Sequence, residues 1–228
     1  MDESWPATGV RTSFYARDKA EVERILDAFE REHPEARAVR LRSALIFKRE
    51  AASGSRRLFA GPFLPTFLLR RRLLPVVPNV PGLRVQAVHS ADIAEAYRLA
   101  LHADVRGAFN VAAEPVLDPP MVARLLGARL VPFPARALRA GASLAWRLRL
   151  QPSPPGWVDM GLGVPLMSFA RAERELEWAP ARGADEAFLE LLAGMREGAG
   201  APTPPLDPKA GGAARKRELA TGVGDRDN

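Results

Sequence analysis

The succession of an amphipathic helix and a β-rich apolar segment near the start of the chain constrains the fold most strongly. Residues 15 to 32 repeat apolar side chains at the i, i+3, i+4 and i+7 positions of a helix, which Pro34 ends. We expect these side chains to form one buried stripe: Val22, Ile25, Leu26 and Phe29. The segment AVRLRSALIF, residues 38 to 47, predicts a strand that is buried on both faces. A helix followed by such a strand is the repeating unit of a parallel α/β sheet.

The remaining sequence predicts more helices and strands of the same kind. Strands are expected at residues 84–89, 107–115 and 129–133, and helices at 92–103, 117–128, 135–150, 168–178 and 184–197. A short helix is expected within residues 63–74, and the prolines that follow indicate a long connection. Asp92 and Glu95 form a capping box at the start of the 92–103 helix. One face of that helix is expected to be apolar, with Ile93, Ala96, Tyr97 and Ala100.

The composition is that of a globular protein with a core. The chain has 228 residues, of which 47% are hydrophobic and 26% charged, and it contains no cysteine, which excludes disulfides and thiolate metal sites. We expect one domain over residues 1–197 and a disordered tail over 198–228, where glycine, proline and charge dominate. The sequence contains neither a signal-peptide pattern nor a membrane-length apolar run, which predicts a cytoplasmic protein without membrane contact.

The net charge of +6 raises nucleic-acid binding as a minor alternative. The basic residues are scattered, apart from runs at residues 70–72 and 215–217. Neither run alternates with aromatic side chains, as a surface that stacks on bases would. Nucleic acid is therefore an unfavoured partner.

A tyrosine and a lysine lie one helical turn apart at the start of the first helix. The chain has two tyrosines, and four lysines among its 33 basic residues, so the spacing of Tyr15 and Lys19 is unusual here. Side chains at i and i+4 share a helix face, and the lysine ammonium would stabilise a tyrosine phenolate by charge attraction. The residues alone leave a second interpretation open, in which Tyr15 packs and Lys19 extends along the surface into solvent.

Several segments, taken together and in their order, resemble a known family. They are YARDK, RLRSALIF, VQAVHSADIAEAYRLAL, GAFNVAAEP and SFARAERELEWAP. Their order and spacing are similar to the C-terminal part of the extended short-chain dehydrogenase/reductases, also called NAD-dependent epimerase/dehydratases. The resemblance implies an α/β fold with a partial Rossmann-like parallel sheet, helices and small C-terminal substrate-domain elements, and with the N-terminal strands of the fold missing.

The resemblance also implies roles for individual residues. Tyr15 would be the general acid/base, Lys19 would assist it, and the two side chains would together contact the nicotinamide ribose. Arg42, Ser43 and Ala44 would lie beside the coenzyme, with Ser43 at a position where the family usually has proline. The implied coenzyme is NAD or NADP. The implied substrate is a small hydroxy or keto compound such as a nucleotide sugar.

The sequence departs from the family in its nucleotide-binding half. The family binds pyrophosphate at a Gly-rich turn between a strand and a helix, whereas the nearest candidate here, Gly161-Leu162-Gly163, leads into Pro165. We therefore expect a fragment of an oxidoreductase or epimerase with impaired or no coenzyme binding alone. The alternative is a non-catalytic binding or regulatory module that pairs with a full-length homologue, a second copy or an acidic partner, and that has an exposed sheet edge.

Three further polar residues match the family's segments but are expected to be structural. Asp92 fits a helix cap, His89 a buried histidine, and Asn110 a hydrogen-bonding residue in a turn or at a sheet edge.

Overall fold

The computed structural model describes residues 1–60, 75–151, 153–203 and 206–207. The helix predicted within residues 63–74 and both arginine-containing runs lie outside the described residues, as does most of the predicted tail. The chain divides into two compact units, each assembled from three segments. The first unit comprises Met1–Ile46, Arg84–Leu117 and Asp159–Ala187; the second comprises Phe47–Leu83, Asp118–Val158 and Phe188–Asn228.

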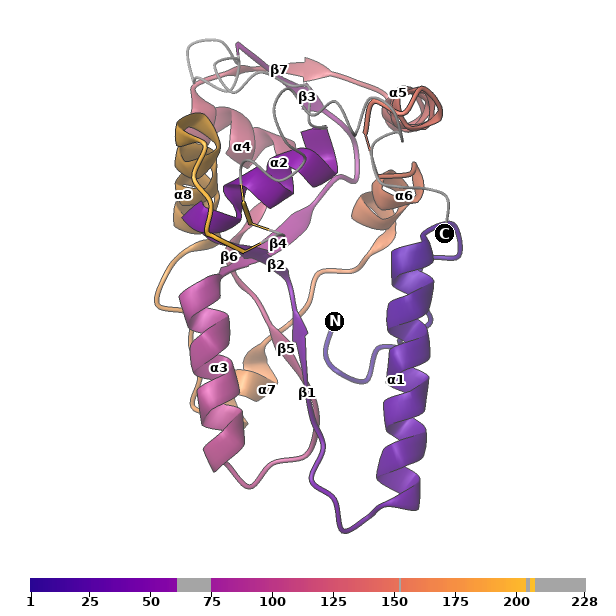
Figure 1. Cartoon of the computed structure of the whole chain (residues 1–228), viewed down its shortest axis with the longest axis vertical. Coiled ribbons are helices and arrows are strands. Elements are labelled where there is room, and N and C mark those ends of the chain that lie inside the picture. Colours follow the sequence, from indigo (N-terminus) through magenta and orange to yellow (C-terminus); the bar gives the residue numbers. More distant parts are fainter. Residues whose placement is uncertain (61–74, 152, 204–205, 208–228) are drawn as a thin grey trace. The chain divides into compact units, whose positions relative to one another are not determined.

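The first unit contains a parallel and an antiparallel strand pairing and the helices beside them (Figure 1). Its helices are α1 (Phe14–Glu32), α3 (Ser90–His102) and α7 (Ala170–Glu175). Its strands are β1 (Val39–Ser43), β4 (Val85–His89), β5 (Gly107–Val111) and β6 (Ala113–Leu117), together with most of β2 (Leu45–Phe47). β1 pairs with β5 in parallel, and β4 lies between β2 and β6, antiparallel to β6. The predicted α/β class, with parallel strand pairs, is thus confirmed.

The apolar core of the first unit lies between the β1–β5 pair, α3 and α7. Its buried members are Val88, Ile93, Ala96, Ala100, Phe109, Val111, Ala172, Leu176 and Trp178. Val39 and Leu41 of β1 pack against this core. Because successive strand residues point to opposite faces, Arg40 and Arg42 point the other way, toward α1.

The prediction of one strand buried on both faces is therefore wrong. Residues 38–47 form two strands, β1 and β2, that belong to different sheets. The arginines on alternate positions of β1 explain the difference, since charged side chains need partners or solvent on the face that they occupy. The predicted 107–115 strand divides in the same way into β5 and β6.

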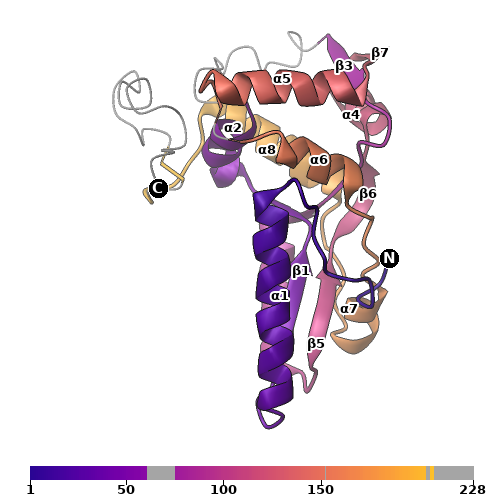
Figure 2. The same cartoon turned by 90° about the vertical axis from the view of Figure 1, so that its right-hand side faces the viewer.

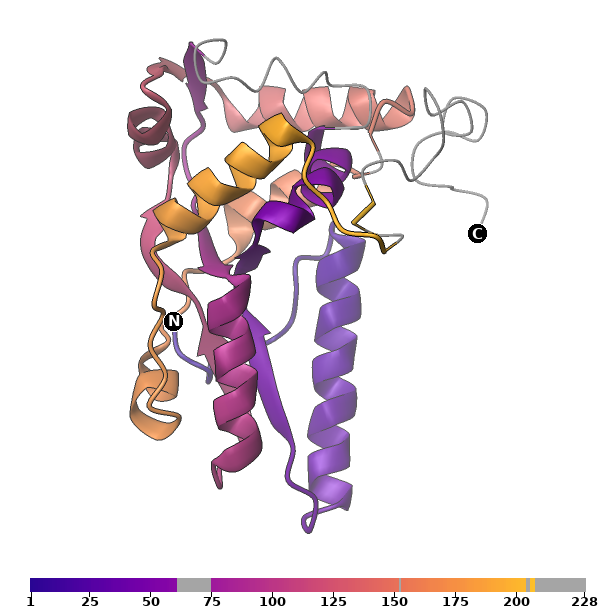
Figure 3. The ribbon, with the colours of Figure 1, turned by 60° about the vertical axis from the view of Figure 1, so that its left-hand side comes forward.

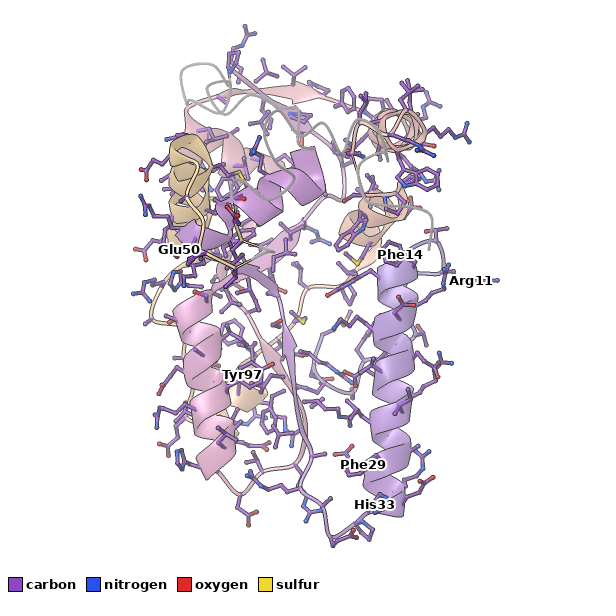
Figure 4. The ribbon with its side chains drawn as sticks, viewed as in Figure 1. Arg11, Phe14, Phe29, His33, Glu50 and Tyr97 are labelled. Carbon is purple, nitrogen blue, oxygen red and sulfur yellow. The ribbon has the colours of Figure 1, made fainter. Side chains whose placement is uncertain are left out.

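Helix α1 begins where it was expected but turns its apolar stripe to solvent. The Oγ of Ser13 caps the helix by accepting the Ala16 N–H at 3.3 Å. Val22, Ile25 and Phe29 are 47%, 59% and 41% exposed and Leu26 is half-buried, so the predicted burial of this stripe is wrong for three of its four residues. The buried residues of α1 are Ala16 and Ala20, on the face toward the cavity described below. Figure 4 labels Phe29 near the end of α1 and Phe14 at its start, both of them exposed.

Helix α3 packs by apolar contact. Ile93, Ala96 and Ala100 are buried as predicted, but Tyr97 is exposed. The cap of α3 is His89, whose Nδ1 accepts the Ala91 N–H, so the predicted capping role of Asp92 is wrong. In Figure 3, α3 and α1 lie on either side of β1.

The second unit contains one parallel strand pair with a helix packed on it. The pair is β3 (Val76–Asn79) and β7 (Arg129–Pro132), and α4 (Pro119–Leu126) contacts both strands. β3 lies where a long connection was predicted, because the prolines of this segment hid its strand character. The unit also contains the short helix η1 (Arg49–Ala51), α2 (Ala52–Ala60) and α5 (Ala135–Arg147). Its core gathers Val77, Ala123, Leu126 and Leu192.

Two helices cross the division between the units: α6 (Gly156–Gly163) and α8 (Ala184–Glu197). α8 was predicted with these bounds, and α4, α5 and α7 fall inside their predicted ranges, whereas α2 and α6 were not predicted. Among the described residues, no helix has both the length and the apolar character needed to cross a bilayer.

Candidate functional site

A cavity of about 560 Å³ lies within the first unit, between α1, β1 and the segment at the start of the chain. Figure 2 shows α1 running alongside β1 and β5. The cavity is lined by Tyr15 and Lys19 on α1 and by Arg42 and Ser43 on β1. Four of the five residues predicted for the site therefore line one cavity. Ala44 does not line it.

Tyr15 and Lys19 lie against each other on the face of α1 that borders the cavity. The Lys19 Nζ is 5.6 Å from the centroid of the Tyr15 ring, within the range of a cation–π contact. Tyr15 is 39% exposed and Lys19 is also accessible, so both side chains remain open to a small molecule. The two polar groups, a phenol and an ammonium, are thus presented together at the cavity.

The first turn of α1 is held in place by the segment before it. Gly9 has a φ of +70°, and a Cβ there would lie 2.5 Å from the Ala16 carbonyl oxygen. Only glycine accommodates both this backbone conformation and this close approach. The segment before α1 can therefore pass directly against the turn that carries Tyr15.

Arg42 is occupied by contacts within the protein. Its Nε and Nη2 donate to the Glu23 carboxylate at 3.1 and 2.7 Å, and its Nη1 donates to the Glu3 carbonyl at 3.0 Å. Each nitrogen of the guanidinium thus has a partner. Ala44 is similarly engaged, because its N–H donates to the Val111 carbonyl at 2.9 Å. Of the three β1-side residues proposed for the coenzyme, Ser43 is the exposed one that lines the cavity.

Glu23 is a cavity residue that the sequence did not single out. It lies one turn beyond Lys19, so Tyr15, Lys19 and Glu23 follow each other at i, i+4 and i+8. That spacing is visible in the sequence. The sequence does not indicate, however, which charged residues of the following strand form ion pairs with Glu23.

Arg40 extends the same network along α1. It pairs with Glu23, Asp27 and Glu30 at 2.9, 2.6 and 2.7 Å. Burial lowers the pKa of Arg40, but the hydrogen bond to Asp27 and the negative charges of Glu30 and Glu23 outweigh it and raise the pKa. The guanidinium therefore stays charged, and the network is held by a permanent cation.

The wall opposite α1 is a backbone segment held by two side-chain amides. Gln86 donates to the Met167 carbonyl at 3.0 Å and accepts the Met167 N–H at 2.7 Å. Asn110 donates to the Ser168 carbonyl at 3.1 Å, and its own N–H donates to the Glu3 carboxylate at 2.8 Å. The prediction that Asn110 is a sheet-edge hydrogen-bonding residue is confirmed. Further side chains of the lining that the sequence did not indicate are Trp5, Tyr97, Met160, Val164 and Pro165.

His89 and Asp92 lie at the start of α3, and neither lines the cavity. Asp92 is buried; its Oδ2 accepts the Arg182 N–H at 3.2 Å, and its carbonyl accepts the Trp178 indole N–H at 2.8 Å. These contacts tie α3 to the segment after α7, which is a structural role.

Two groups at the cavity could hold the ribose end of a nicotinamide coenzyme. They are the hydroxyl of Tyr15 and the ammonium of Lys19, which lies 5.6 Å from the centroid of the Tyr15 ring. The pyrophosphate end is not matched, because Gly161 and Gly163 are part of α6 and form no turn between a strand and a helix. Within the described residues, no Gly-rich turn connects a strand to a helix N-terminus.

Comparison with known proteins identifies the fold. No family model and no curated protein sequence matches the chain. The structure of gox2253 is similar with a TM-score of 0.56 and 21% identity over 86% of this chain and 60% of that one. A nucleoside-diphosphate-sugar epimerase from Pseudomonas aeruginosa gives a TM-score of 0.52 and 15% identity over 81% of this chain and 56% of its own.

A third similar structure contains a coenzyme. DesIV, a dTDP-glucose 4,6-dehydratase from Streptomyces venezuelae determined with NAD and TYD bound, gives a TM-score of 0.51 and 16% identity. The match covers 86% of this chain and 54% of DesIV. The chain thus spans less than two thirds of the length of each of these structures. Its fold is that of part of the NAD-dependent epimerase/dehydratase structures, as the sequence resemblance predicts.

Proposed function

We propose that this chain carries the acid–base part of an NAD(P)-dependent oxidoreductase or epimerase site, with Tyr15 and Lys19 as its functional pair. The observation that supports this most directly is the contact of the Lys19 ammonium with the Tyr15 ring at the border of a cavity. The fold shared with a coenzyme-containing dehydratase is consistent with it. Because the pyrophosphate cradle is not found in the described residues, we propose that the chain alone binds NAD or NADP weakly or not at all.

Tyr15 would move the proton of the reaction. Its hydroxyl would donate a proton to a substrate carbonyl oxygen or accept one from a substrate hydroxyl, and bound NAD(P) would accept or supply the hydride. Lys19 would stabilise the phenolate and hydrogen-bond the ribose. Arginine would be a poor replacement for Lys19, because its planar fork has a different reach.

The substrate would be a small hydroxy or keto compound. Two of the similar structures are named as enzymes of nucleotide sugars, and by analogy a nucleotide sugar is the first class to test. In this chain Met160, Val164, Pro165 and Met167 line the same cavity as Tyr15.

A non-catalytic binding or regulatory module is the second candidate. Two observations favour it: β1 has a strand on one side only among the described residues, and the apolar stripe of α1 is exposed. An open strand edge beside an apolar helix face suits pairing with a homologue or a second copy.

Calorimetric titration of the purified chain with NAD and with NADP separates the two candidates. Micromolar affinity would reject the module. The absence of heat would fit both candidates, since the chain alone is proposed to bind NAD(P) weakly or not at all; a stable oligomer in solution would then favour the module. If binding is seen, Lys19→Met should weaken it at least tenfold, or about 1.4 kcal/mol, whereas Phe14→Leu, a change outside the cavity lining on the same helix, should not alter it.

Tyr15→Phe tests the acid–base role in any preparation that shows turnover. The variant keeps the ring under Lys19 but removes the hydroxyl that moves the proton, so turnover of nucleotide sugars should fall by about 10²-fold or more. Coenzyme affinity should fall much less, because the Lys19 ammonium would still hydrogen-bond the ribose. Turnover within a few-fold of the parent would show that Tyr15 is not the acid/base.

A further inference from the structure

Helix α1 has little apolar packing on its inner side, so another interaction must set its rotation. Its buried residues are two alanines; of its larger apolar side chains, Val22 and Leu26 border the cavity, and Ile25 and Phe29 are exposed. Rotation matters because each residue of a helix is turned by about 100° from the last, so a small change would carry Tyr15 and Lys19 off the cavity.

The contact between Glu23 and Arg42 is suited to this task. The Arg42 Nε and Nη2 meet the two carboxylate oxygens of Glu23 at 3.1 and 2.7 Å, which is a two-point contact between two planar groups. The two side chains are only 18% and 24% exposed. A bidentate pair of this kind fixes direction as well as distance, unlike a single charge contact.

The position of Glu23 links this contact to the functional pair. Glu23 shares the helix face of Tyr15 and Lys19 and lines the same cavity. The other partner, Arg42, lies near the end of β1, where its backbone is fixed by pairing with Asn110 of β5 in the parallel ladder. A rigid strand thus holds one end of the contact, and the helix that carries Tyr15 and Lys19 holds the other.

We propose that Glu23 is a positioning residue, whose two-point contact with Arg42 sets the rotation of α1 and directs Tyr15 and Lys19 into the cavity. The significance of this role for catalysis rests on the proposed function, but the role itself does not require coenzyme binding. In this proposal Arg42, for which the resemblance implies a place beside the coenzyme, has a structural role: it joins β1 to α1 through Glu23.

The test uses the aromatic ring of Tyr15 as a local probe. The chain has five methionines, so ¹³C labelling of the methionine methyl groups yields few signals, and those of Met160 and Met167, which line the same cavity but lie outside α1, should be shifted by the ring current of Tyr15. Met160→Leu and Met167→Leu identify the signals, and Tyr15→Leu gives their positions without the ring. This readout does not depend on NAD(P), so its failure is distinct from failure of the proposed function.

Three variants then decide the proposal. Glu23→Gln and Arg42→Lys should each lose more than half of the ring-current shift, since both remove the two-point contact and Arg42→Lys keeps the charge. Glu21→Gln is the matched control: it removes the same charge from the same helix, at an exposed residue paired with Arg24, and should keep the shift. The indole signal of buried Trp178 verifies that each variant is folded.

Retention of the full shift in folded Glu23→Gln and Arg42→Lys would overturn the proposal. If Glu23→Gln does not fold, Arg42→Lys alone decides. Equal loss in Glu21→Gln would also overturn it, because the effect would then come from the charge of the helix and not from the contact.

Discussion

The two helices beside β1 are attached to the same strand by opposite kinds of interaction (Figure 1). On one face, Val39 and Leu41 pack into the core that contains the buried side of α3. On the other face, Arg40 and Arg42 reach acidic residues of α1: Glu23, Asp27 and Glu30. A five-residue strand thus joins an apolar interface to an ionic one simply by alternating its side chains.

The comparison shows that the two faces of β1 have different roles: one contributes mainly to folding stability, and the other fixes the orientation of α1. Apolar burial contributes most of the folding free energy but is weakly directional. A partly buried ion-pair network contributes less net stability, because desolvation offsets much of its attraction, but it holds groups in a defined orientation. In this unit the directional interface is the one next to the candidate site.

The largest expected effect lies on the apolar side. Ile93→Ala on α3 should lower the free energy of unfolding by about 2–5 kcal/mol, because it leaves a cavity in the core. Urea unfolding followed by tryptophan fluorescence measures it. Leu101→Ala, at a 73% exposed position of the same helix, should change stability by less than about 0.5 kcal/mol. Similar losses for the two variants would mean that α3 is not held by its core face.

A smaller loss is expected on the ionic side. Glu23→Gln should cost about 1–2 kcal/mol, since both Arg40 and Arg42 lose a charged acceptor in a partly buried place. The loss should shrink in high salt, where screening already weakens the network, while the loss for Ile93→Ala should persist. If the loss in the free energy of unfolding for Glu23→Gln did not change with salt, the α1 side of β1 would not be held mainly by ionic contacts.

A still smaller effect is expected on the outer face of α1. Ile25→Ser replaces the most exposed residue of the apolar stripe and should change the stability of the monomer by less than about 0.5 kcal/mol. Unfolding should be measured at several protein concentrations. A loss above 1.4 kcal/mol that grows with concentration would show that a second copy covers the stripe.

The smallest effect concerns an exposed ion pair on α7. The hydrogen bond from Arg171 lowers the pKa of Glu175. The stabilisation is therefore present above the ordinary carboxyl pKa and is lost as the pH falls through the depressed value in the folded state. Glu175→Gln should cost less than about 0.5 kcal/mol at neutral pH and nothing in strong acid. An equal cost at both pH values would assign the effect to packing.

The helices and the alternation of elements were predictable from sequence because they depend on local periodicity. α1, α4 and α8 follow apolar spacing and caps that are readable in the chain, such as Asp118 before the prolines of α4. The division of residues 38–47 into two strands was not predictable, because it depends on which sheet each half joins. The same reason explains the exposure of Val22 and Ile25, since periodicity shows that a helix has an apolar face but not what lies opposite it.

The candidate site divides in the same way. The Tyr15–Lys19 pair is a contact between neighbours on one helix, and its spacing is visible in the sequence. The partners of Arg42 come from segments 19 and 39 residues away in the chain, Glu23 and Glu3. Single-sequence patterns do not report such distant pairs, and the coenzyme role of Arg42 is implied by the family resemblance alone.

The amide clamps of Gln86 and Asn110 have a consequence for how this cavity can change. Both grip main-chain atoms of residues 167 and 168, so the path of that wall is independent of the side chains that it carries. Substitutions at Met167 can therefore reshape the lining of the cavity that Tyr15 also borders, while the backbone of the wall stays in place. A fold built in this way can change its ligand specificity by replacing a few cavity-lining side chains on a fixed backbone.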